Sequence, residues 1–528
     1  MNPRKPSAII RTTRTTALCA LALGGAFAVG GCPNEADNCE NFNTCDGTGA
    51  TGGSGAQGGG GVGGGTPAEC IPSSLGSGES PADTCGVFVS SSMGHDDSGT
   101  GSKTAPYATI GRALQASASV IYACTDGFSE AVTLPAGTSL YGGLDCAHNW
   151  TYVGALTNTP LTAAADAVPL TLGAGSGTTH VEDMDVTAAP AVAVGGSSIA
   201  VIASGVTAEI VGSSITAGGG AAGESSQQVG PDGGLDGTNG VNGNPALGAG
   251  SCAALQSNAG GTPGQKTCGG TVVDGGAGGI GSPSIPGGTG DEGQPTTPDT
   301  TGDGGPGQPS GAGSCGQGEQ GANGSPGTSG SGAAEIGTID AQGYHGADGT
   351  AGGTGVHGQG GGGGGGGRCN AGATGPSGGG GGSGGCGAAG GGAGRAAGSS
   401  IAMLSFDSAL TLTSCSITTA AGGAGGDGAL GQDGGTGAFV PSAGGGAGAC
   451  GGGQGGNGGP GGPGGGGHGG HSIGIAFDGG TAPVTTDSTF SIGALGPGGA
   501  GGDTPALDGD AGQSCQSLDF ASSTCTNG

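Results

Sequence analysis

The sequence contains one pattern twice, as SSIAVIASGVTAEIVGSSITAGGGAAG (residues 197–223) and as SSIAMLSFDSALTLTSCSITTAAGGAG (residues 399–425). The two copies align without a gap at a shift of 202 positions. Repeated units of this kind indicate stacked coils, each of which buries its apolar face only against its neighbours. The pattern therefore predicts that Ile215 and Ile417 lie in equivalent positions of neighbouring coils.

Two further matches extend the stack. Residues 181–188 align on residues 210–217, a shift of 29 positions, and a weaker copy with one inserted residue covers 472–491. A solenoid coil tolerates a long loop at one corner, because the entropy of loop closure grows only logarithmically with loop length. We therefore interpret residues 223–398 and 425–470 as insertions into a continuous stack.

Composition excludes several classes of protein. The chain has 528 residues, of which 145 are Gly, and aromatic residues make up only 3%. Nine Lys and Arg face 38 Asp and Glu, so the basic surface that a nucleic-acid-binding protein needs is missing. No stretch of 18 or more apolar residues is present, which excludes a membrane-spanning helix in the processed chain. A compact α/β enzyme is a poor fit to so much glycine.

The N-terminal segment 1–31 has the features of a secretory signal, namely a basic start and the apolar run Ala17–Val29. It ends in VGGC, which resembles a bacterial lipobox and predicts that Cys32 becomes the acylated N-terminus. Pro33 after this Cys favours the outer membrane, by resemblance to lipoprotein sorting. The alternative is ordinary cleavage near Gly31, with Cys32 as a plain disulfide cysteine. Two or more acyl chains on one residue would give stable membrane anchoring.

Cysteine usage agrees with export, because 17 Cys in such a chain imply disulfides and an oxidising compartment. Short separations suggest the pairs Cys39–Cys45, Cys70–Cys85, Cys124–Cys146, Cys252–Cys268, Cys369–Cys386 and Cys515–Cys525. Cys315 and Cys450 are left to pair or not. Cys415 aligns with Ser213 of the earlier copy, so we expect it to be a buried, unpaired thiol. No paired CxxC motif supports a zinc site, and we expect no metal and no cofactor.

Residues 67–222 are richer in apolar residues than the following segment, and they contain short strand-like runs punctuated by Gly and Pro. Pro106 to Ala118 has the apolar spacing of a short amphipathic helix. The predicted organisation is a signal peptide (1–31), a lipid anchor and glycine-rich tether (32–66), an N-terminal solenoid (67–222), a glycine-rich insertion (223–398), a solenoid coil (399–424), a second glycine-rich insertion (425–470) and a C-terminal coil with tail (471–528).

Part of the first solenoid segment carries a family resemblance. The motifs are FVS at 88–90, HDDSGTGS at 95–102, APYATI at 105–110, EAVTL at 130–134 and SLYGG at 139–143. Together they resemble the opening of pectate-lyase-like right-handed parallel β-helix domains of a subgroup of unknown function. The resemblance covers residues 85–153 and implies an all-β fold, a right-handed parallel β-helix whose short N-terminal helix caps the first coil.

Glycine recurs every third residue in the insertions, from Gly343 to Gly367, from Gly422 to Gly437 and from Gly452 to Gly466. Three residues per turn is the repeat of an extended polyproline-II-type helix, so bundled polyglycine-II strands are one interpretation. Disordered loops are a second, and collagen-like trimers are a third that the low proline content disfavours. The texture resembles the glycine-rich part of PE-PGRS proteins, although the helical module that opens those proteins is absent.

Few residues suggest chemistry. Gly381–Gly385 fits the GxSxG nucleophile motif, but it lacks the strand and the helix that the motif requires. His468 and His471 are spaced so that both could ligate a metal. Asp96 and Asp97, with Asp126 or Glu130, could form an acid and base pair, although capping of loops is the usual role of Asp.

The five basic residues that follow the signal are too scattered for the cationic cluster that a polysaccharide lyase uses. These residues are Lys103, Arg112, Lys266, Arg368 and Arg395. The sequence therefore predicts a non-catalytic, lipid-anchored envelope or surface protein with a structural or adhesive role. Its partners would be the membrane, through its acylated N-terminus, and a glycan or matrix ligand, but not nucleic acid. The alternative is a secreted polysaccharide-active enzyme, either a glycoside hydrolase or a lyase.

Overall fold

The computed structural model describes residues 66–154, 157–247, 258–283, 286–369, 374–440 and 448–527. The chain divides between Val62 and Gly63 into two units, and all described residues belong to the second. Most regular structure in this unit is β, arranged mainly in three parallel sheets. No helix among the described residues is long and apolar enough to cross a membrane.

The strands of the three sheets follow one another in parallel, apart from two short antiparallel strands. The first sheet contains β1 (Val87–Val89), β2 (Val120–Cys124), β5 (Ser139–Asp145), β9 (Thr178–Glu182), β12 (Thr207–Val211), β19 (Ala409–Thr413) and β22 (Val484–Thr486), with β6 (Thr151–Tyr152) antiparallel beside β5. The second contains β3 (Phe128–Ser129), β7 (Thr159–Thr162), β10 (Met184–Thr187), β13 (Ser214–Ala217), β20 (Ser416–Thr419) and β23 (Thr489–Ser491). The third contains β4 (Val132–Leu134), β8 (Leu170–Leu172), β11 (Ser198–Ser204), β18 (Ser400–Phe406), β21 (Ser472–Asp478) and β24 (Ser514–Asp519), with β25 (Thr524–Thr526) antiparallel beside β24.

Successive strands visit the three sheets in a fixed order, and each round pairs in parallel with the round before it. Strands β11, β12 and β13 form one round, and β18, β19 and β20 form the next, although 182 residues separate β13 from β18. Ile215 pairs with Ile417, as the aligned copies predict. Val181 pairs with Ile210, which confirms the shift of 29 positions. Ile417 pairs in turn with Phe490 of the third copy.

The core of these stacked sheets (the strands of the three sheets with their connections) is made of inward-facing apolar side chains. Strand β12 alternates exposed and buried residues, and its inward Ala208 and Ile210 are each 1% exposed. Ile215 and Ile417 lie in the same core cluster. A repeat that preserves these inward positions preserves the buried surface, which is why the copies stack in register.

The N-terminal helix is shorter than the amphipathic pattern predicts. Helix α2 spans Ile110–Gln115, and the side chain of Thr109 accepts a hydrogen bond from the N–H of Arg112 at its start. Tyr107 instead forms a parallel bridge with Val89 of β1, so the backbone is still extended there. Within the described residues, the remaining helical segments are α1 (Pro72–Leu75) and the 3-10 turns η1 (Ala68–Cys70), η2 (Asp83–Cys85), η3 (Cys146–His148), η4 (Gly233–Leu235) and η6 (Pro505–Leu507).

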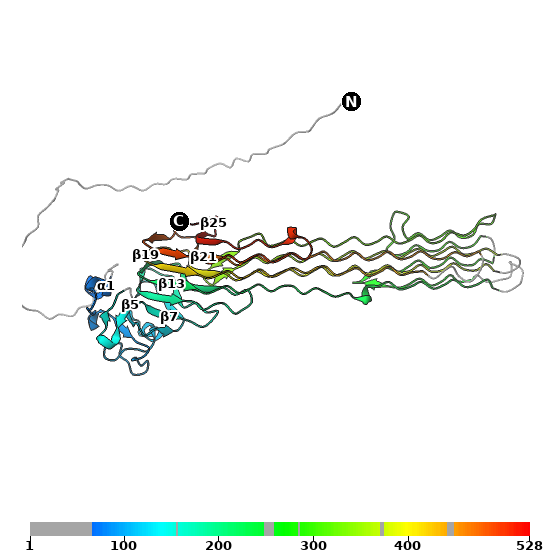
Figure 1. The fold of residues 1–528 in the computed structure, drawn as a ribbon. Helices are drawn as coiled ribbons and strands as arrows, with labels where there is room; N and C mark the ends of the chain where they lie inside the picture. Colours follow the sequence, from blue (N-terminus) through cyan, green and yellow to red (C-terminus); the bar gives the residue numbers. More distant parts are fainter. Residues whose placement is uncertain are drawn as a thin grey trace, which may run out of the picture. The chain divides into compact units, whose positions relative to one another are not determined.

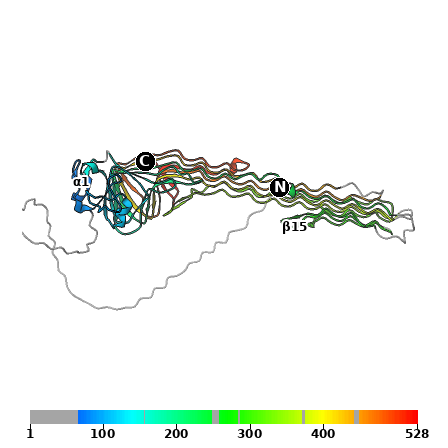
Figure 2. The same ribbon diagram turned by 90° about the horizontal axis from the view of Figure 1, so that it is seen from below.

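The glycine-rich segments are ordered and lie side by side (Figures 1 and 2). Backbone N–H groups of Gly352, Gly355 and Gly358 donate to the carbonyl oxygens of Gly391, Ala388 and Gly385, with N···O distances of 2.8–2.9 Å. This step of three residues recurs between segments 350–366 and 453–465 and between 319–331 and 350–362. Such a period is that of the extended helix expected for bundled polyglycine-II strands, and the disordered-loop interpretation is wrong for the described residues.

We call this region the glycine-rich bundle, meaning the described parts of 223–398, 425–470 and 492–512. Residues 492–512 belong to it as well as the two predicted insertions, because Gly496 and Gly499 donate hydrogen bonds to Gly470 and Gly467. Two short hairpins interrupt the bundle, β14–β15 (Thr267–Cys268 and Thr271–Val272) and β16–β17 (Thr338–Asp340 and Gly343–His345).

Disulfides crosslink each of the two regions internally. The expected pairs Cys70–Cys85, Cys124–Cys146 and Cys515–Cys525 form, and Cys315 pairs with Cys450. The expectations of Cys252–Cys268 and Cys369–Cys386 are wrong, because Cys268 is bonded to Cys386 across 118 residues. Cys369 is also disulfide-bonded. The rule of short separations fails here because segments distant in sequence lie adjacent in the bundle. These disulfides indicate an oxidising, extracytoplasmic environment.

Candidate functional site

Several predicted site residues lie outside the described residues. These are Cys32, the expected lipid attachment site, and the cysteines Cys39, Cys45 and Cys252. Cys415 is free and buried, as expected, and its thiol lies 3.4 Å from the carbonyl oxygen of Ile210. Burial raises the pKa of this thiol, so the reactive thiolate is disfavoured.

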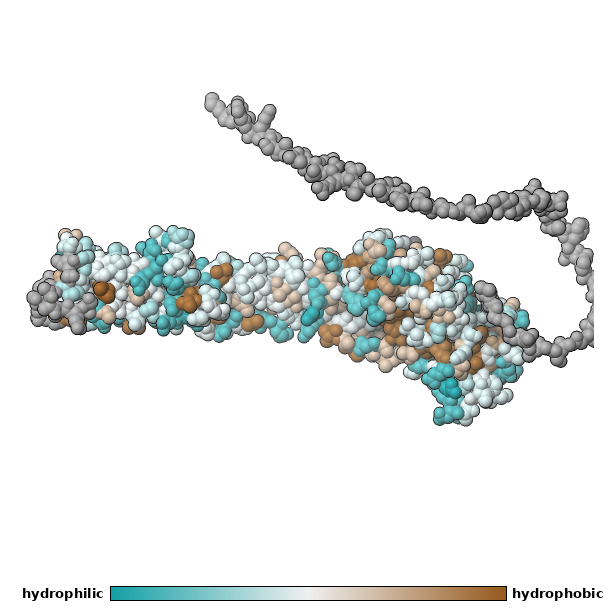
Figure 3. Space-filling view, turned by 180° about the vertical axis from the view of Figure 1, so that it is seen from behind, coloured by the Kyte–Doolittle hydropathy of each residue, from teal (hydrophilic) through white to brown (hydrophobic). Residues whose placement is uncertain are grey.

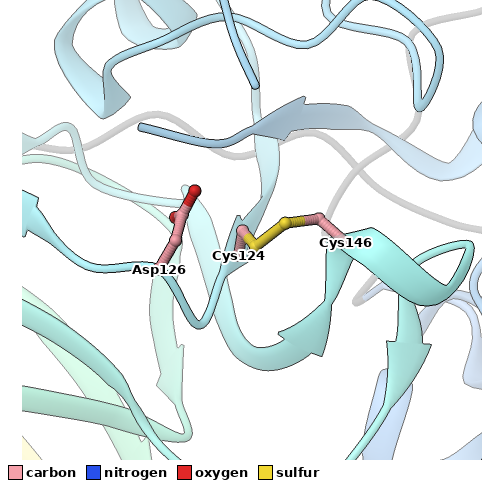
Figure 4. A group of neighbouring side chains, drawn as sticks. All are labelled: Cys124, Asp126 and Cys146. Carbon is pink, nitrogen blue, oxygen red and sulfur yellow. A yellow bond between two sulfur atoms is a disulfide. The ribbon is translucent and has the colours of Figure 1, made fainter. Parts of the chain in front are cut away.

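One group of potential metal ligands is found among the described residues, and it consists of Cys124, Asp126 and Cys146 (Figure 4). Their ligand atoms lie within 4.8 Å of one another. The two sulfur atoms, however, are joined in a disulfide, so neither cysteine offers a thiolate to an ion. The group is therefore a crosslink with an adjacent carboxylate and does not fit a metal.

Asp126 orders a loop. Its carboxylate accepts hydrogen bonds from Ser90 Oγ (2.7 Å), Ser92 N (2.8 Å) and Ser92 Oγ (2.6 Å). Burial acts to raise the pKa of Asp126, but the hydrogen bonds from Ser92, Ser90 and Ser91 outweigh it and leave the pKa below its ordinary value. A carboxylate held ionised in this way is a poor general acid.

The other acidic candidates hold the start of α2. Asp96 accepts hydrogen bonds from the N–H groups of Ala108 and Thr109, at 2.8 and 3.1 Å. Glu130 accepts from the N–H groups of Ile110 and Gly111, at 2.8 and 3.0 Å. Carboxylates satisfy the unpaired N–H groups of a helix start and are stabilised by its dipole. Asp97 is exposed. Asp96 and Glu130 thus accept from neighbouring backbone N–H groups at the start of α2, where both carboxylates hold the local backbone.

The histidine pair is buried, and both ring nitrogens of His471 are hydrogen-bonded. His471 Nδ1 accepts a hydrogen bond from Gln513 N, and Nε2 donates to the carbonyl oxygen of Ile336, both at 2.8 Å. Burial lowers the pKa of His471 to about 4. His468 uses Nδ1 at 2.6 Å from its neighbour's carbonyl oxygen. Because both nitrogens of His471 are engaged, the pair does not form a metal site.

Ser383, the centre of the GxSxG motif, is buried in the glycine-rich bundle. Its Oγ accepts a hydrogen bond from Thr238 N at 2.7 Å. No strand or helix adjoins it, so the sharp turn that exposes a nucleophile is missing.

The basic residues are separated, and each has its own partner. Lys103 Nζ donates to Ser80 Oγ at 2.6 Å and lies over the ring of Phe88. Arg112 stacks on Tyr107, with its guanidinium carbon 4.7 Å from the ring centroid. The other partners are a backbone carbonyl for Lys266, two for Arg368, and Asp348 for Arg395 at 2.7 Å. No cluster of basic side chains forms in the described part of the chain.

The sequence reasoning missed a buried acidic cluster on the first sheet. Tyr152 Oη donates to Asp183 Oδ2 at 2.7 Å, and His180 Nε2 lies 2.8 Å from Glu182 Oε2. His180 also lies opposite Glu209 on the next strand. Burial raises the pKa of Asp183 to about 6. The sequence could have predicted this cluster. His180 and Glu182 are two residues apart and so share one face of the strand, and the shift of 29 positions places Glu209 beside His180.

Exposed apolar residues on the glycine-rich bundle are scattered. Figure 3 shows them on one face as isolated positions along the bundle rather than as a continuous patch. Val356, Val241 and Phe439 are 54%, 54% and 70% exposed. Single exposed apolar residues do not by themselves mark an interface.

Comparisons with protein-family models, with curated proteins and with solved structures found no match.

Proposed function

We propose that this chain is an exported, lipid-anchored, non-catalytic protein of the outer membrane or cell surface, with a structural or adhesive role toward a glycan or the envelope matrix. One observation carries the non-catalytic role. Three of the four carboxylates considered for catalysis are engaged in ordering local backbone or its capping side chains, and the basic residues are dispersed. Such residues stabilise a scaffold rather than bind and convert an anionic sugar.

We also propose that the stacked sheets are a right-handed parallel β-helix like that of pectate-lyase-like domains. The fixed order in which successive strands visit three parallel sheets supports this proposal. The glycine-rich bundle then leaves one corner of the helix and returns to it.

The anchor is tested by replacing Cys32. In a bacterial host fed a radiolabelled fatty acid, the wild-type chain should carry label and sediment with membranes. Cys32→Ser should carry no label and appear in the soluble exported fraction. Equal solubility of the two proteins would overturn the anchoring proposal.

The non-catalytic role is tested separately with a panel of polysaccharides. We expect retention on one or more of them, or on envelope preparations, without new reducing ends or unsaturated products. Turnover that is lost in Asp97→Asn would instead establish the polysaccharide-active enzyme.

A further inference from the structure

Residues 273–279 of the glycine-rich bundle lie between two longer extended segments. We call the space between these two segments a lane, and residues 273–279 fill only part of its length. On one side, Gly384, Gly381 and Gly378 donate N–H groups to the carbonyl oxygens of this lane, which are those of Val273, Gly276 and Gly279. On the other side, Gly276 and Gly279 donate to the carbonyl oxygens of Gly361 and Gly364. The lane is therefore hydrogen-bonded to a neighbouring segment on each side, with a period of three residues. We call the segment 352–364 the first wall and the segment 378–391 the second wall.

The lane stops at the hairpin β14–β15. Gly269 and Gly270 have φ angles of +55° and +96°, which let the chain turn back at this point. The N–H of Val273 donates to Lys266 within the hairpin instead of to a wall. Both walls continue beyond the hairpin as segments 352–358 and 385–391, which are hydrogen-bonded to each other.

A groove takes the place of the lane beyond the hairpin. It has a volume of about 560 Å³, within the range of ligand-binding pockets. Residues 267–269 of the hairpin line one part of it, and 354–357 and 386–389 line the two walls.

The first wall carries carbonyl oxygens that no N–H reaches. Moving along it from Gly361 in steps of three, these oxygens belong to Gly358, Gly355 and Gly352, and no described residue donates to them. These oxygens point the same way as the oxygen of Gly361, which is bonded to the lane. This follows because each of the four oxygens would meet a Cβ added to the glycine opposite it in the second wall. The facing glycines are Gly381, Gly384, Gly387 and Gly390 for the oxygens of Gly361, Gly358, Gly355 and Gly352.

The second wall has N–H groups that no lane carbonyl accepts from. Its next N–H, that of Gly387, donates to His357 Nδ1 at 2.9 Å rather than to a lane carbonyl. The N–H after that, of Gly390, has no acceptor among the described residues. The imidazole of His357 thus takes the place of one missing carbonyl, and the rest of the lane remains unpaired.

We propose that this groove binds an extended polypeptide segment with glycine at every third residue, which continues the lane of residues 273–279. Its N–H groups would bond to the carbonyl oxygens of Gly355 and Gly352. The place beside the oxygen of Gly358 is already taken by Val273, whose own carbonyl accepts from Gly384. The carbonyls of the bound segment would accept from Gly390 and, after displacement of His357, from Gly387. This is the bundle's counterpart of strand addition at a sheet edge, in which backbone hydrogen bonds supply affinity.

The glycine requirement follows from the existing lane. A Cβ at Gly275, Gly278 or Gly281 would meet a carbonyl oxygen of the second wall, those of Gly381, Gly378 and Gly375 respectively. The same wall borders the groove, so a chain entering it meets this restriction at every third position. A sugar offers no such repeat of N–H donors and glycine positions.

The test is fluorescence anisotropy of labelled (Gly-Gly-Ser)₄ with the purified full chain, and (Ala-Ala-Ser)₄ is the matched control peptide. Thr354 lines the groove and is exposed, so Thr354→Tyr fills the groove from its solvent side. Val241 is 54% exposed on the bundle and is not part of the groove lining, so Val241→Tyr is the matched control variant. All variants are first checked for wild-type circular dichroism and melting temperature.

We expect saturable binding of the glycine peptide, no binding of the alanine peptide, at least tenfold weaker binding to Thr354→Tyr and no change in Val241→Tyr. His357→Ala should bind several-fold more tightly, because the N–H of Gly387 is then open. Absence of binding to the folded chain, equal effects of the two tyrosines, or displacement of the peptide by a neutral oligosaccharide would overturn the proposal. The groove is independent of anchoring at Cys32, so the outcome does not depend on the proposed function.

Discussion

The stacked sheets and the glycine-rich bundle belong to one compact unit, but they are held together by different parts of the polypeptide. In the stacked sheets, apolar side chains such as Ile215 and Ile417 meet in a core. In the bundle, backbone groups of different segments bond directly, and a Cβ at Gly361 would meet the carbonyl oxygen of Gly453. The comparison teaches that segments without side chains can pack backbone against backbone. Segments with apolar side chains must instead enclose a core that buries them.

The largest expected effect tests how the bundle is closed. The disulfide Cys268–Cys386 closes a loop of 118 residues, and Cys70–Cys85 closes one of 15. On chain-entropy grounds, we expect Cys268→Ala with Cys386→Ala to cost about 4–5 kcal/mol and the equivalent change at the shorter loop about 3 kcal/mol. Thermal unfolding and limited proteolysis of both double variants measure this. An unchanged melting temperature for the first would show that the bundle does not depend on its crosslink.

The next effect tests the side-chain core. Ile417 is fully buried and stacks on Ile215, so Ile417→Ala should lower the free energy of unfolding by about 2–5 kcal/mol. Val192 is 73% exposed, and Val192→Ala should change it by less than about 0.5 kcal/mol. Denaturant titration of both variants gives the comparison. A loss of similar size in both would contradict the stacking of the two copies.

The corresponding change in the bundle adds a methyl group instead of removing one. Gly361→Ala should destabilise the bundle by about 1–3 kcal/mol, because the added Cβ meets backbone that cannot move easily. At Gly230 nothing lies within 4 Å of an added Cβ, so Gly230→Ala should be neutral or slightly stabilising. Melting curves of the two variants decide the matter, and equal tolerance at both positions would mean that the segments are not packed.

The smallest effect concerns the acidic cluster. The pKa of Asp183 is raised from 3.8 to about 6, so between these pH values the folded state holds a proton that the unfolded state releases. Stability from this group is therefore greatest below about pH 4 and is lost as the pH rises through 6. Asp183→Asn should flatten this slope and add roughly 1–2 kcal/mol at pH 7. Denaturation at pH 4, 5, 6 and 7 tests it, and an unchanged slope would contradict the burial argument.

The sequence predicted the register of the stacked sheets because their inward positions repeat. Val181, Ile210 and Leu412 align in the sequence copies and pair in the structure. The period of the glycine segments was also visible, although periodicity alone could not distinguish a bundle from disordered loops. What decides between them is hydrogen bonding between segments far apart in the chain.

Other features depend on three-dimensional contacts that no local pattern encodes. Cys268 meets Cys386 because two glycine segments lie side by side, and separation along the chain gives no sign of this. The candidate carboxylates Asp96 and Glu130 were chosen for their chemistry, but they hold the backbone where the helix at Ile110 begins. The buried acidic cluster follows from the repeat register and could have been predicted from it.

The most direct test of the central claim, that backbone hydrogen bonds hold the glycine-rich segments together, is amide hydrogen exchange of the folded chain. We predict that glycine amides in segments 352–366 and 453–465 exchange far more slowly than in an unstructured peptide, with protection approaching that of strands β11 and β18. Exchange of these amides at the rate of a free peptide, with the strands still protected, would contradict the account.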